Sequence, residues 1–174
     1  MPQHSATVDE FVQYWQSIRE RTMRVAHLVP ESQMDWAATN GAMSFADILR
    51  HLALIERWMF TETVLGRPSR YVSHGEEHAS GKAAVLQLMR RLHVDSIEQL
   101  LTLTPHDLER KVSTPAGAHI TAWKWLRAMV EHEVHHSGQL YLMLRFCGVT
   151  TPPIFGLTSE QLAATADPCV TTLP

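Results

Sequence analysis

The sequence predicts an all-α protein, specifically a four-helix bundle with long connections, and two observations support this. Nine prolines leave four long proline-free windows, at 3–29, 31–67, 69–104 and 116–151. Proline is excluded from helix interiors because it lacks an amide N–H and clashes with the preceding turn. Within these windows the apolar residues recur at steps of three and four, the helical period, and none alternates as a strand would. Four windows of this kind predict four helices.

The first two helices are expected at about Thr7–Leu28 and Ser44–Gly66. In the first, the residues at the helical period run through Val8, Phe11, Trp15, Ile18, Thr22, Val25 and Leu28. The second opens on Ser44, with Asp47 three residues later in place of the usual Glu of a capping box. Its apolar stripe consists of Ile48, Leu52, Ile55 and Met59, and Gly66 ends it.

The other two helices are expected at about Lys82–Leu103 and Ile120–Cys147. The third carries Val85, Leu88, Met89, Leu92, Ile97, Leu100 and Leu101, and the inward row of the fourth is Trp125, Met129, His132, His136, Leu140, Met143 and Cys147. The intervening connections, 66–80 and 104–119 among them, exceed the two to eight residues usual in a simple bundle. We therefore expect crossovers or loops folded over the bundle, and a short capped helix after Thr158.

Composition narrows the class of protein. A chain of 174 residues predicts a single domain, 1–174, with its core at about 8–165. Fifteen basic and 18 acidic residues give a net charge of −3, which argues against nucleic-acid binding. The two cysteines form no disulfide or metal pattern, and neither a signal peptide nor a membrane span is visible. These features predict a cytoplasmic protein that does not bind membranes.

Three of the eleven histidines suggest a metal site. His132 and His136 are four residues apart, so they share one face of a helix, between Met129 and Leu140 on its inward row. One metal ion would satisfy both imidazoles, although two hydrogen-bonded core histidines would look the same. His51 interrupts the apolar stripe of the second helix and is the candidate third ligand. Asp47 could orient the His51 ring, but a helix cap is the preferred interpretation.

The segment 132–136 also matches H-E-x-x-H, the helix signature of zinc proteases, with Glu133 as general base. The extended form of that motif requires glycine three residues after the second histidine, where this chain has Gln139. Glu160 could supply a third ligand in this alternative, but it follows a Pro-Pro break. His135 is assigned to the rim of the site or to a contact between helices. The other histidines, including His93, are assigned to the surface, and His74 and His78 to a loop that does not preorganise them.

Several segments resemble the DinB-like family of proteins, named for DNA-damage-inducible members. The segment 131–140, with Leu144, Arg145 and Gly148, resembles the last helix of that family. The segment 47–52 resembles its second helix, and 152–158 resembles the tail of one subgroup. The resemblance spans about residues 8 to 165. Ser137 departs from it, because the family commonly has Arg at this position.

The resemblance implies a four-helix bundle that holds a divalent metal, often zinc or nickel, with three histidines. These correspond here to His51, His132 and His136. It also implies a homodimer, and a superfamily that includes transferases using low-molecular-weight thiols. We therefore expect a metal-dependent enzyme of the thiol-dependent transferase type acting on a small molecule. The alternatives are a metal-water hydrolase and a non-catalytic dimeric binding module.

Proton competition sets an expected pH range for the metal. A metal binds neutral imidazole, and the reference pKa of histidine is about 6.5. On this basis, metal loss is expected between about pH 7 and pH 5.

Overall fold

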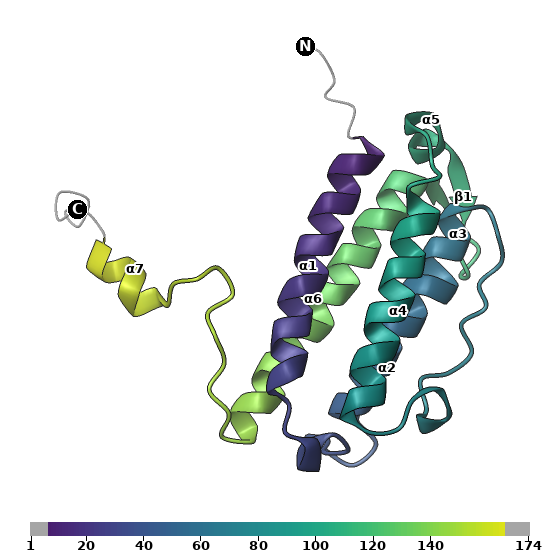
Figure 1. Ribbon diagram of the computed structural model, residues 1–174. Coiled ribbons are helices and arrows are strands. Elements are labelled where there is room, and N and C mark those ends of the chain that lie inside the picture. The colour runs from purple at the N-terminus through teal and green to yellow at the C-terminus, as the bar shows by residue number, and fades with distance from the viewer. Residues whose placement is uncertain (1–6, 166–174) are drawn as a thin grey trace.

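A computed structural model describes residues 7–165 of the chain, and it is a four-helix bundle (Figure 1). The bundle helices are α1 (Val8–Leu28), α2 (Phe45–Ile55), α4 (Lys82–Leu100) and α6 (Ala122–Phe146). Short helical elements connect them: η1 (Glu31–Gln33), η2 (Glu56–Thr61), α3 (Glu62–Val64), η3 (Glu76–His78), α5 (Pro105–Glu109) and α7 (Ser159–Thr165). None of the described helices is both long and apolar enough to cross a membrane.

Side chains cap several of the described helices, at Ser44 and Thr158 as predicted and also at Thr7. The Thr7 and Ser44 hydroxyls each accept a bond from the backbone N–H three residues on, in complete capping boxes. Thr158 and Gln161 bond reciprocally at the start of α7. The predicted short capped helix of the tail is therefore present.

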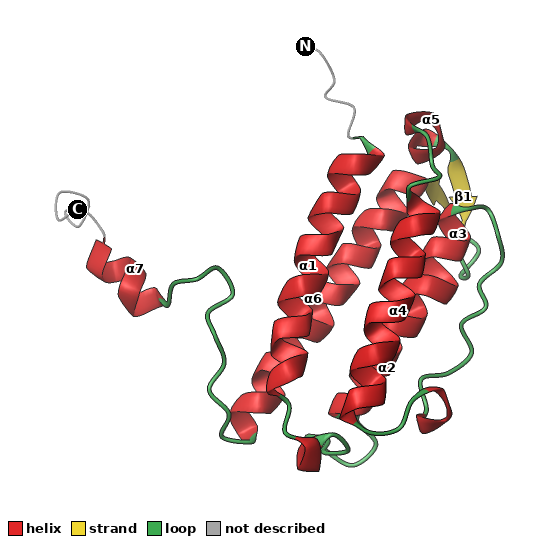
Figure 2. Cartoon of the chain, viewed as in Figure 1, coloured by secondary structure: helices red, strands yellow, loops and turns green. Residues whose placement is uncertain are grey.

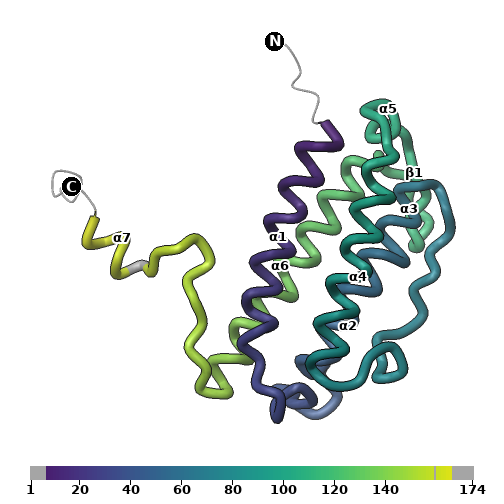
Figure 3. Tube along the Cα trace, viewed as in Figure 1, coloured from purple at the N-terminus to yellow at the C-terminus, as the bar shows by residue number. Residues whose placement is uncertain are grey.

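The four long helices are not packed in the order of the chain. α1 packs against α6 and α4, and α2 packs against the same two helices, so α1 and α2 lie across a diagonal. In Figure 1, α1 and α6 run downward, whereas α2 and α4 run upward. The connection between α3 and α4 must therefore return along the outside of the bundle, as Figure 3 shows. The expectation of folded-over connections is confirmed.

The connection before the last helix contains strands that the sequence analysis did not predict. Residues Lys111–Ser113 (β1) and His119–Thr121 (β2) form an antiparallel hairpin in which Val112 pairs with Ile120 (Figure 2). The last helix begins at Ala122, two residues after its predicted start at about Ile120. A strand of three residues is too short to show a recognisable alternation of apolar and polar residues. The two strands can be identified only from their pairing in the structure.

The core consists of two apolar clusters separated by a polar layer. One cluster centres on Phe45, Leu49 and Met89, and the other on Phe11, Trp15 and Leu126. Between them α1, η2, α4 and α6 contribute the buried or nearly buried polar side chains of Arg19, Glu56, His93 and Glu133. The three candidate metal ligands lie on α2 and α6 at this middle level of the bundle.

Candidate metal centre

His51 on α2 meets His132 and His136 on α6 between the two helices. Each ring offers one nitrogen to a group whose atoms all lie within 4.8 Å of one another. The Nε2 atoms of His51 and His132 are 3.0 Å apart. Two nitrogens bound to one zinc ion at about 2.0–2.1 Å lie roughly 3 Å apart, so this spacing already suits a shared ion. The structure brings together the three residues that the sequence singled out.

In two of the three histidines, the ring nitrogen that does not face the other histidines has a hydrogen-bond partner. Nδ1 of His51 lies 2.7 Å from the Tyr71 hydroxyl, and Nδ1 of His136 lies 2.7 Å from Oε1 of Gln139. Because an amide oxygen only accepts, Nδ1 of His136 donates, which leaves Nε2 free as a ligand. Partners of this kind orient ligand rings in metal sites generally. His135, on the rim as predicted, lies 3.2 Å from the Gln139 amide nitrogen.

The connection between α3 and α4 brings two further groups to the centre. The Tyr71 hydroxyl lies 2.8 Å from Nδ1 of His74, and the His74 ring centroid is 5.4 Å from that of His51. His74 lies in the loop that the sequence predicts and does not pair with His78, but its bond to Tyr71 was not predicted. That connection returns along the outside of the bundle, so it passes the centre. Nothing in the spacing of residues 66–80 indicates this path.

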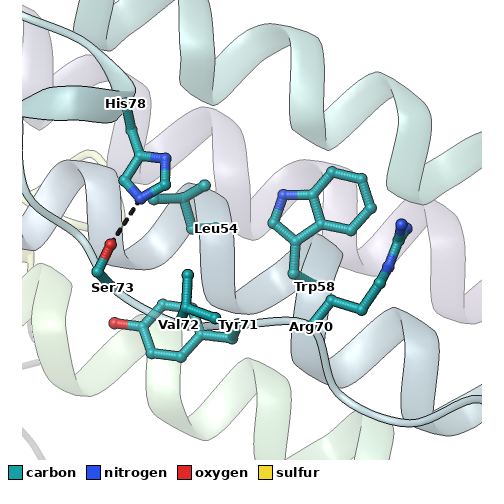
Figure 4. Close-up of a pocket in the computed structure, with 7 residues that line it drawn as sticks. All are labelled: Leu54, Trp58, Arg70, Tyr71, Val72, Ser73 and His78. Atoms are coloured by element: carbon teal, nitrogen blue, oxygen red, sulfur yellow. Dashed lines mark hydrogen bonds between the residues drawn. The ribbon is translucent and has the colours of Figure 1, made fainter.

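Tyr71 also lines a cavity of about 210 Å³ beside the centre (Figure 4). Trp58 and Arg70 form one side of it, and the Arg70 guanidinium lies 4.1 Å from the centroid of the Trp58 ring. On the other side, Nε2 of His78 lies 2.7 Å from the Ser73 hydroxyl. His78 therefore belongs to the cavity and not to the histidine cluster.

Burial keeps the histidines of the centre neutral. Desolvation, followed by the proximity of His132 and His136, lowers the pKa of His51 to about 3. Desolvation and His136 lower the pKa of His132 to about 4, and burial also lowers the pKa of His136. All three rings are neutral at pH 7, which is the form that binds a metal ion. Imidazole donors suit zinc, nickel, copper and iron alike, so the residues fit a divalent metal without selecting one.

Glu133, the candidate base of the H-E-x-x-H interpretation, is held in the polar layer. It is 1% exposed, and its Oε2 lies 3.2 Å from Nη2 of Arg19 on α1. The same guanidinium forms an ion pair with Glu56, whose Oε1 accepts a 2.8 Å bond from the Trp15 indole. Desolvation, together with the charge of Glu56, raises the pKa of Glu133. The pair with Arg19 on α1 therefore engages Oε2 of Glu133, while Oε1 is buried without a hydrogen-bond partner among the described residues.

The assignment of His93 to the surface was wrong. Its side chain is 13% exposed, and Nδ1 lies 2.8 Å from Oε1 of Glu56. A buried carboxylate needs donors, and His93 and Trp15 supply them from two helices. The sequence contains a signal for this layer, because the charged Glu56 stands within the apolar stripe of the second helix, between Ile55 and Met59.

The two remaining carboxylates of the sequence predictions lie outside the centre. Asp47 bonds the Ser44 backbone at 3.0 Å and Arg50 at 2.7 Å, so it is the predicted helix cap. Glu160 lies on α7, which projects from the bundle in Figure 1. Neither belongs to the histidine group.

A π-helical turn lies beside the centre. In η2 the Thr61 hydroxyl donates a 2.9 Å bond to the Glu56 carbonyl. Phe60 from this turn packs on Trp125 and His132, with ring centroids 4.7 and 5.7 Å away. π-turns inside helices are found frequently at functional sites. Here the turn allows Glu56 to enter the polar layer while Phe60 covers one side of the His132 ring.

We expect Tyr71→Phe to weaken metal binding by roughly 10–100-fold, the usual effect of losing a group that orients a ligand. The fold should be retained, because only a hydroxyl is removed. Competition with a chromophoric chelator measures the change, and Tyr14→Phe, a change at an exposed tyrosine, is the matched control. Equal affinity in both variants would show that Tyr71 does not orient His51.

Comparisons with known proteins agree with this architecture. The DinB family model matches residues 1–168. The uncharacterized protein YjoA of Bacillus subtilis is 23% identical over 150 residues, covering 84% of this chain and 95% of the relative. A DinB-like protein from Bacillus cereus has a TM-score of 0.72 at 17% identity, covering 84% of this chain and 97% of the other.

A third relative carries a functional description. The structure of YfiT from Bacillus subtilis has a TM-score of 0.67 at 19% identity, covering 86% of this chain and 94% of the other. That protein is described as a probable metal-dependent hydrolase with an unusual four-helix bundle topology. Because the family model spans nearly the whole sequence, this chain belongs to the DinB family.

Proposed function

We propose that this protein is an enzyme dependent on a divalent metal held by His51, His132 and His136. The observation that carries the proposal is the convergence of three neutral imidazoles at one point between α2 and α6. Three protein ligands leave a further coordination position for water or substrate, which distinguishes catalytic from structural zinc sites. Zinc and nickel, implied by the family resemblance, are the metals to test first.

The reaction we propose is transfer to a low-molecular-weight thiol. When bound, a divalent metal would lower the pKa of a coordinated thiol, whose proton would pass to solvent at neutral pH. The thiolate sulfur would then form a bond to the electrophilic atom of a small molecule, and the group it displaces would leave with the electron pair of the broken bond. This chemistry needs no protein carboxylate as base. The engagement of Glu133 with Arg19 therefore supports it. The neutral histidines would hold the ion, and Tyr71 and Gln139 bond the second ring nitrogens of His51 and His136.

A metal-water hydrolase is the second candidate, favoured by the description of the YfiT structure. A metal lowers the pKa of bound water to about 7, which yields a nucleophile at neutral pH. The two reactions share the site and differ in the nucleophile. A screen of the metal-loaded protein with electrophilic substrates, with and without small thiols, separates them. Turnover that requires a thiol supports transfer, and turnover in its absence supports hydrolysis.

The partners of this protein are proposals of the same kind. We propose a small-molecule substrate in the cytoplasm, and no nucleic acid, since the net charge is −3.

We expect Glu133→Gln to change thiol-dependent activity by less than about threefold. The metal should stay bound, because the amide replaces an oxygen that is not a ligand. In the H-E-x-x-H interpretation the same change removes the general base, and a base contributes about 10²–10⁴-fold to the rate. Metal content and turnover are measured together, with casein as a second substrate. Casein hydrolysis that disappears in the variant would overturn thiol transfer.

A further inference from the structure

A series of hydrogen bonds leads from the loop before α4 to the metal centre. Nδ1 of His74 lies 2.8 Å from the Tyr71 hydroxyl, which lies 2.7 Å from Nδ1 of His51. Nε2 of His51 in turn lies 3.0 Å from Nε2 of His132. Four side chains from the loop, α2 and α6 are therefore joined in series, and the series ends on His74, outside the candidate ligand set.

The Tyr71 hydroxyl has a single proton, which it can donate to only one of the two ring nitrogens beside it. A neutral imidazole carries its proton on one nitrogen and accepts on the other. If Tyr71 donates to His74, its oxygen can accept from Nδ1–H of His51, and Nε2 of His51 has a free lone pair. If Tyr71 donates to His51, the proton of that ring is on Nε2. Only the first arrangement leaves His51 able to bind a metal ion through Nε2.

The backbone of His74 is fixed to α2 by a buried arginine. Arg50, one residue before His51 and 4% exposed, donates from Nε to the His74 carbonyl at 2.7 Å and from Nη1 to the Ala79 carbonyl at 3.0 Å. Its Nη2 donates to Asp47 at 2.7 Å. The loop is therefore attached to the turn of α2 that carries His51, and its backbone holds His74 in place independently of the His74 ring.

His74 is placed to act on His51 and not on the ion itself. Among the residues that the structure describes, the group that could hold one ion consists of His51, His132 and His136. The His74 ring meets the His51 ring edge-on, with centroids 5.4 Å apart and planes at 80°. Its Nδ1 is engaged by the Tyr71 hydroxyl. The route from His74 to the centre therefore runs through Tyr71.

We propose that His74 is a positioning residue, which accepts the Tyr71 proton and so keeps His51 in the tautomer that binds a metal through Nε2. In metal sites generally, the partner of the second ring nitrogen sets the tautomer of a ligand histidine. Here that partner is a hydroxyl, which both donates and accepts, so a further acceptor is needed to fix its direction. The inference rests on the proposed metal centre, but its first test uses the metal-free protein.

The first test removes the acceptor and then restores it. His74→Leu leaves Nδ1 of His51 as the remaining ring nitrogen beside the Tyr71 hydroxyl, so the fraction of His51 with its proton on Nδ1 should fall. His74→Asn, whose amide oxygen accepts in place of Nδ1, should restore that fraction. Long-range ¹H–¹⁵N NMR of the metal-free full chain reports which ring nitrogen carries the proton. His78→Leu, on the same loop but bonded to Ser73, is the matched control and should behave as the unmodified chain does.

Zinc affinity provides the second test. His74→Leu should weaken zinc binding by about tenfold, within the range usual for losing a group that orients a ligand. In the Tyr71→Phe background the same change should alter the Kd by less than about twofold, because the connection to His51 is already lost. Competition with a chromophoric chelator measures the unmodified chain, the two single variants and the double variant.

Three results would overturn the role of His74. They are an unchanged His51 tautomer in His74→Leu, a changed tautomer that His74→Asn does not restore, and an equal loss of zinc affinity with and without the Tyr71 hydroxyl. Failure of the metal proposal looks different. An unmodified chain that binds no zinc refutes the metal centre, and the tautomer of the metal-free protein then decides the role of His74 by itself.

Discussion

His51→Ala should remove stoichiometric metal from the protein, together with the thermal stability that the metal confers. His51 is the ligand that α2 contributes, and without it the two α6 histidines form an open pair. Metal at 100 times its Kd stabilises the folded state by about 2.7 kcal/mol. In a domain of this size that corresponds to about 5–10 °C in Tm. The variant should therefore melt at the same temperature with metal and with chelator.

The measurement is metal content by elemental analysis, paired with calorimetry in both conditions. His106→Ala, at an exposed histidine on α5, is the matched control and should keep both metal and the shift in Tm. His132→Ala and His136→Ala should behave as His51→Ala does. A His51→Ala protein that retains one metal per chain would refute the three-histidine site and the enzyme proposal that rests on it.

The thermal stability of the metal-free protein should decrease as the pH is lowered from about 7. This decrease should begin at a pH above the one at which the histidines of the folded protein become protonated. The folded-state pKa values are about 3 for His51 and about 4 for His132. In the unfolded chain both are near the reference value of about 6.5. Between these values the unfolded state binds more protons, so the free energy of unfolding decreases as the pH falls. Above about pH 7 both states carry neutral histidines, and this contribution is fully present.

The same lowered pKa values revise the expected pH range of metal loss. The reference pKa places it between about pH 7 and pH 5. In the folded protein His51 and His132 remain neutral down to about pH 5, because their pKa values are about 3 and 4. Burial also lowers the pKa of the third ligand, His136. The Kd for the metal should therefore rise less between pH 7 and pH 5 than the reference pKa of histidine predicts. By contrast, the Tm of the chelator-treated protein should decrease as the pH is lowered from about 7 to about 5.

Competition with a metal indicator at each pH, and calorimetry on the same samples, separate the two effects. A Kd that already rises about 100-fold between pH 7 and pH 5 would show that the folded-state histidines titrate near their reference value. A Tm that does not change with pH or with chelator would instead favour the alternative of a non-catalytic binding module.

The sequence by itself was sufficient for the bundle and for the three candidate ligands. Helix boundaries at Thr7, Ser44 and Lys82 follow from local chemistry: a capping hydroxyl at the first two, and a glycine before the third. A histidine inside an apolar stripe is a departure from a strong periodic pattern, so His51, His132 and His136 stand out without knowledge of the fold. Each of these inferences uses residues fewer than about eight apart, the range over which helical periodicity acts.

Only the tertiary structure decided what surrounds those ligands. Tyr71 and His74 reach His51 because α2 and α4 run in the same direction (Figure 1), so that residues 65–81 return along the bundle between them. Glu133 and Glu56 share Arg19 because three elements distant in sequence meet in one polar layer. These contacts join residues 20 to 114 positions apart. Periodicity within one helix carries no information about which helix lies opposite, and so the fold determines the environment of the ligands.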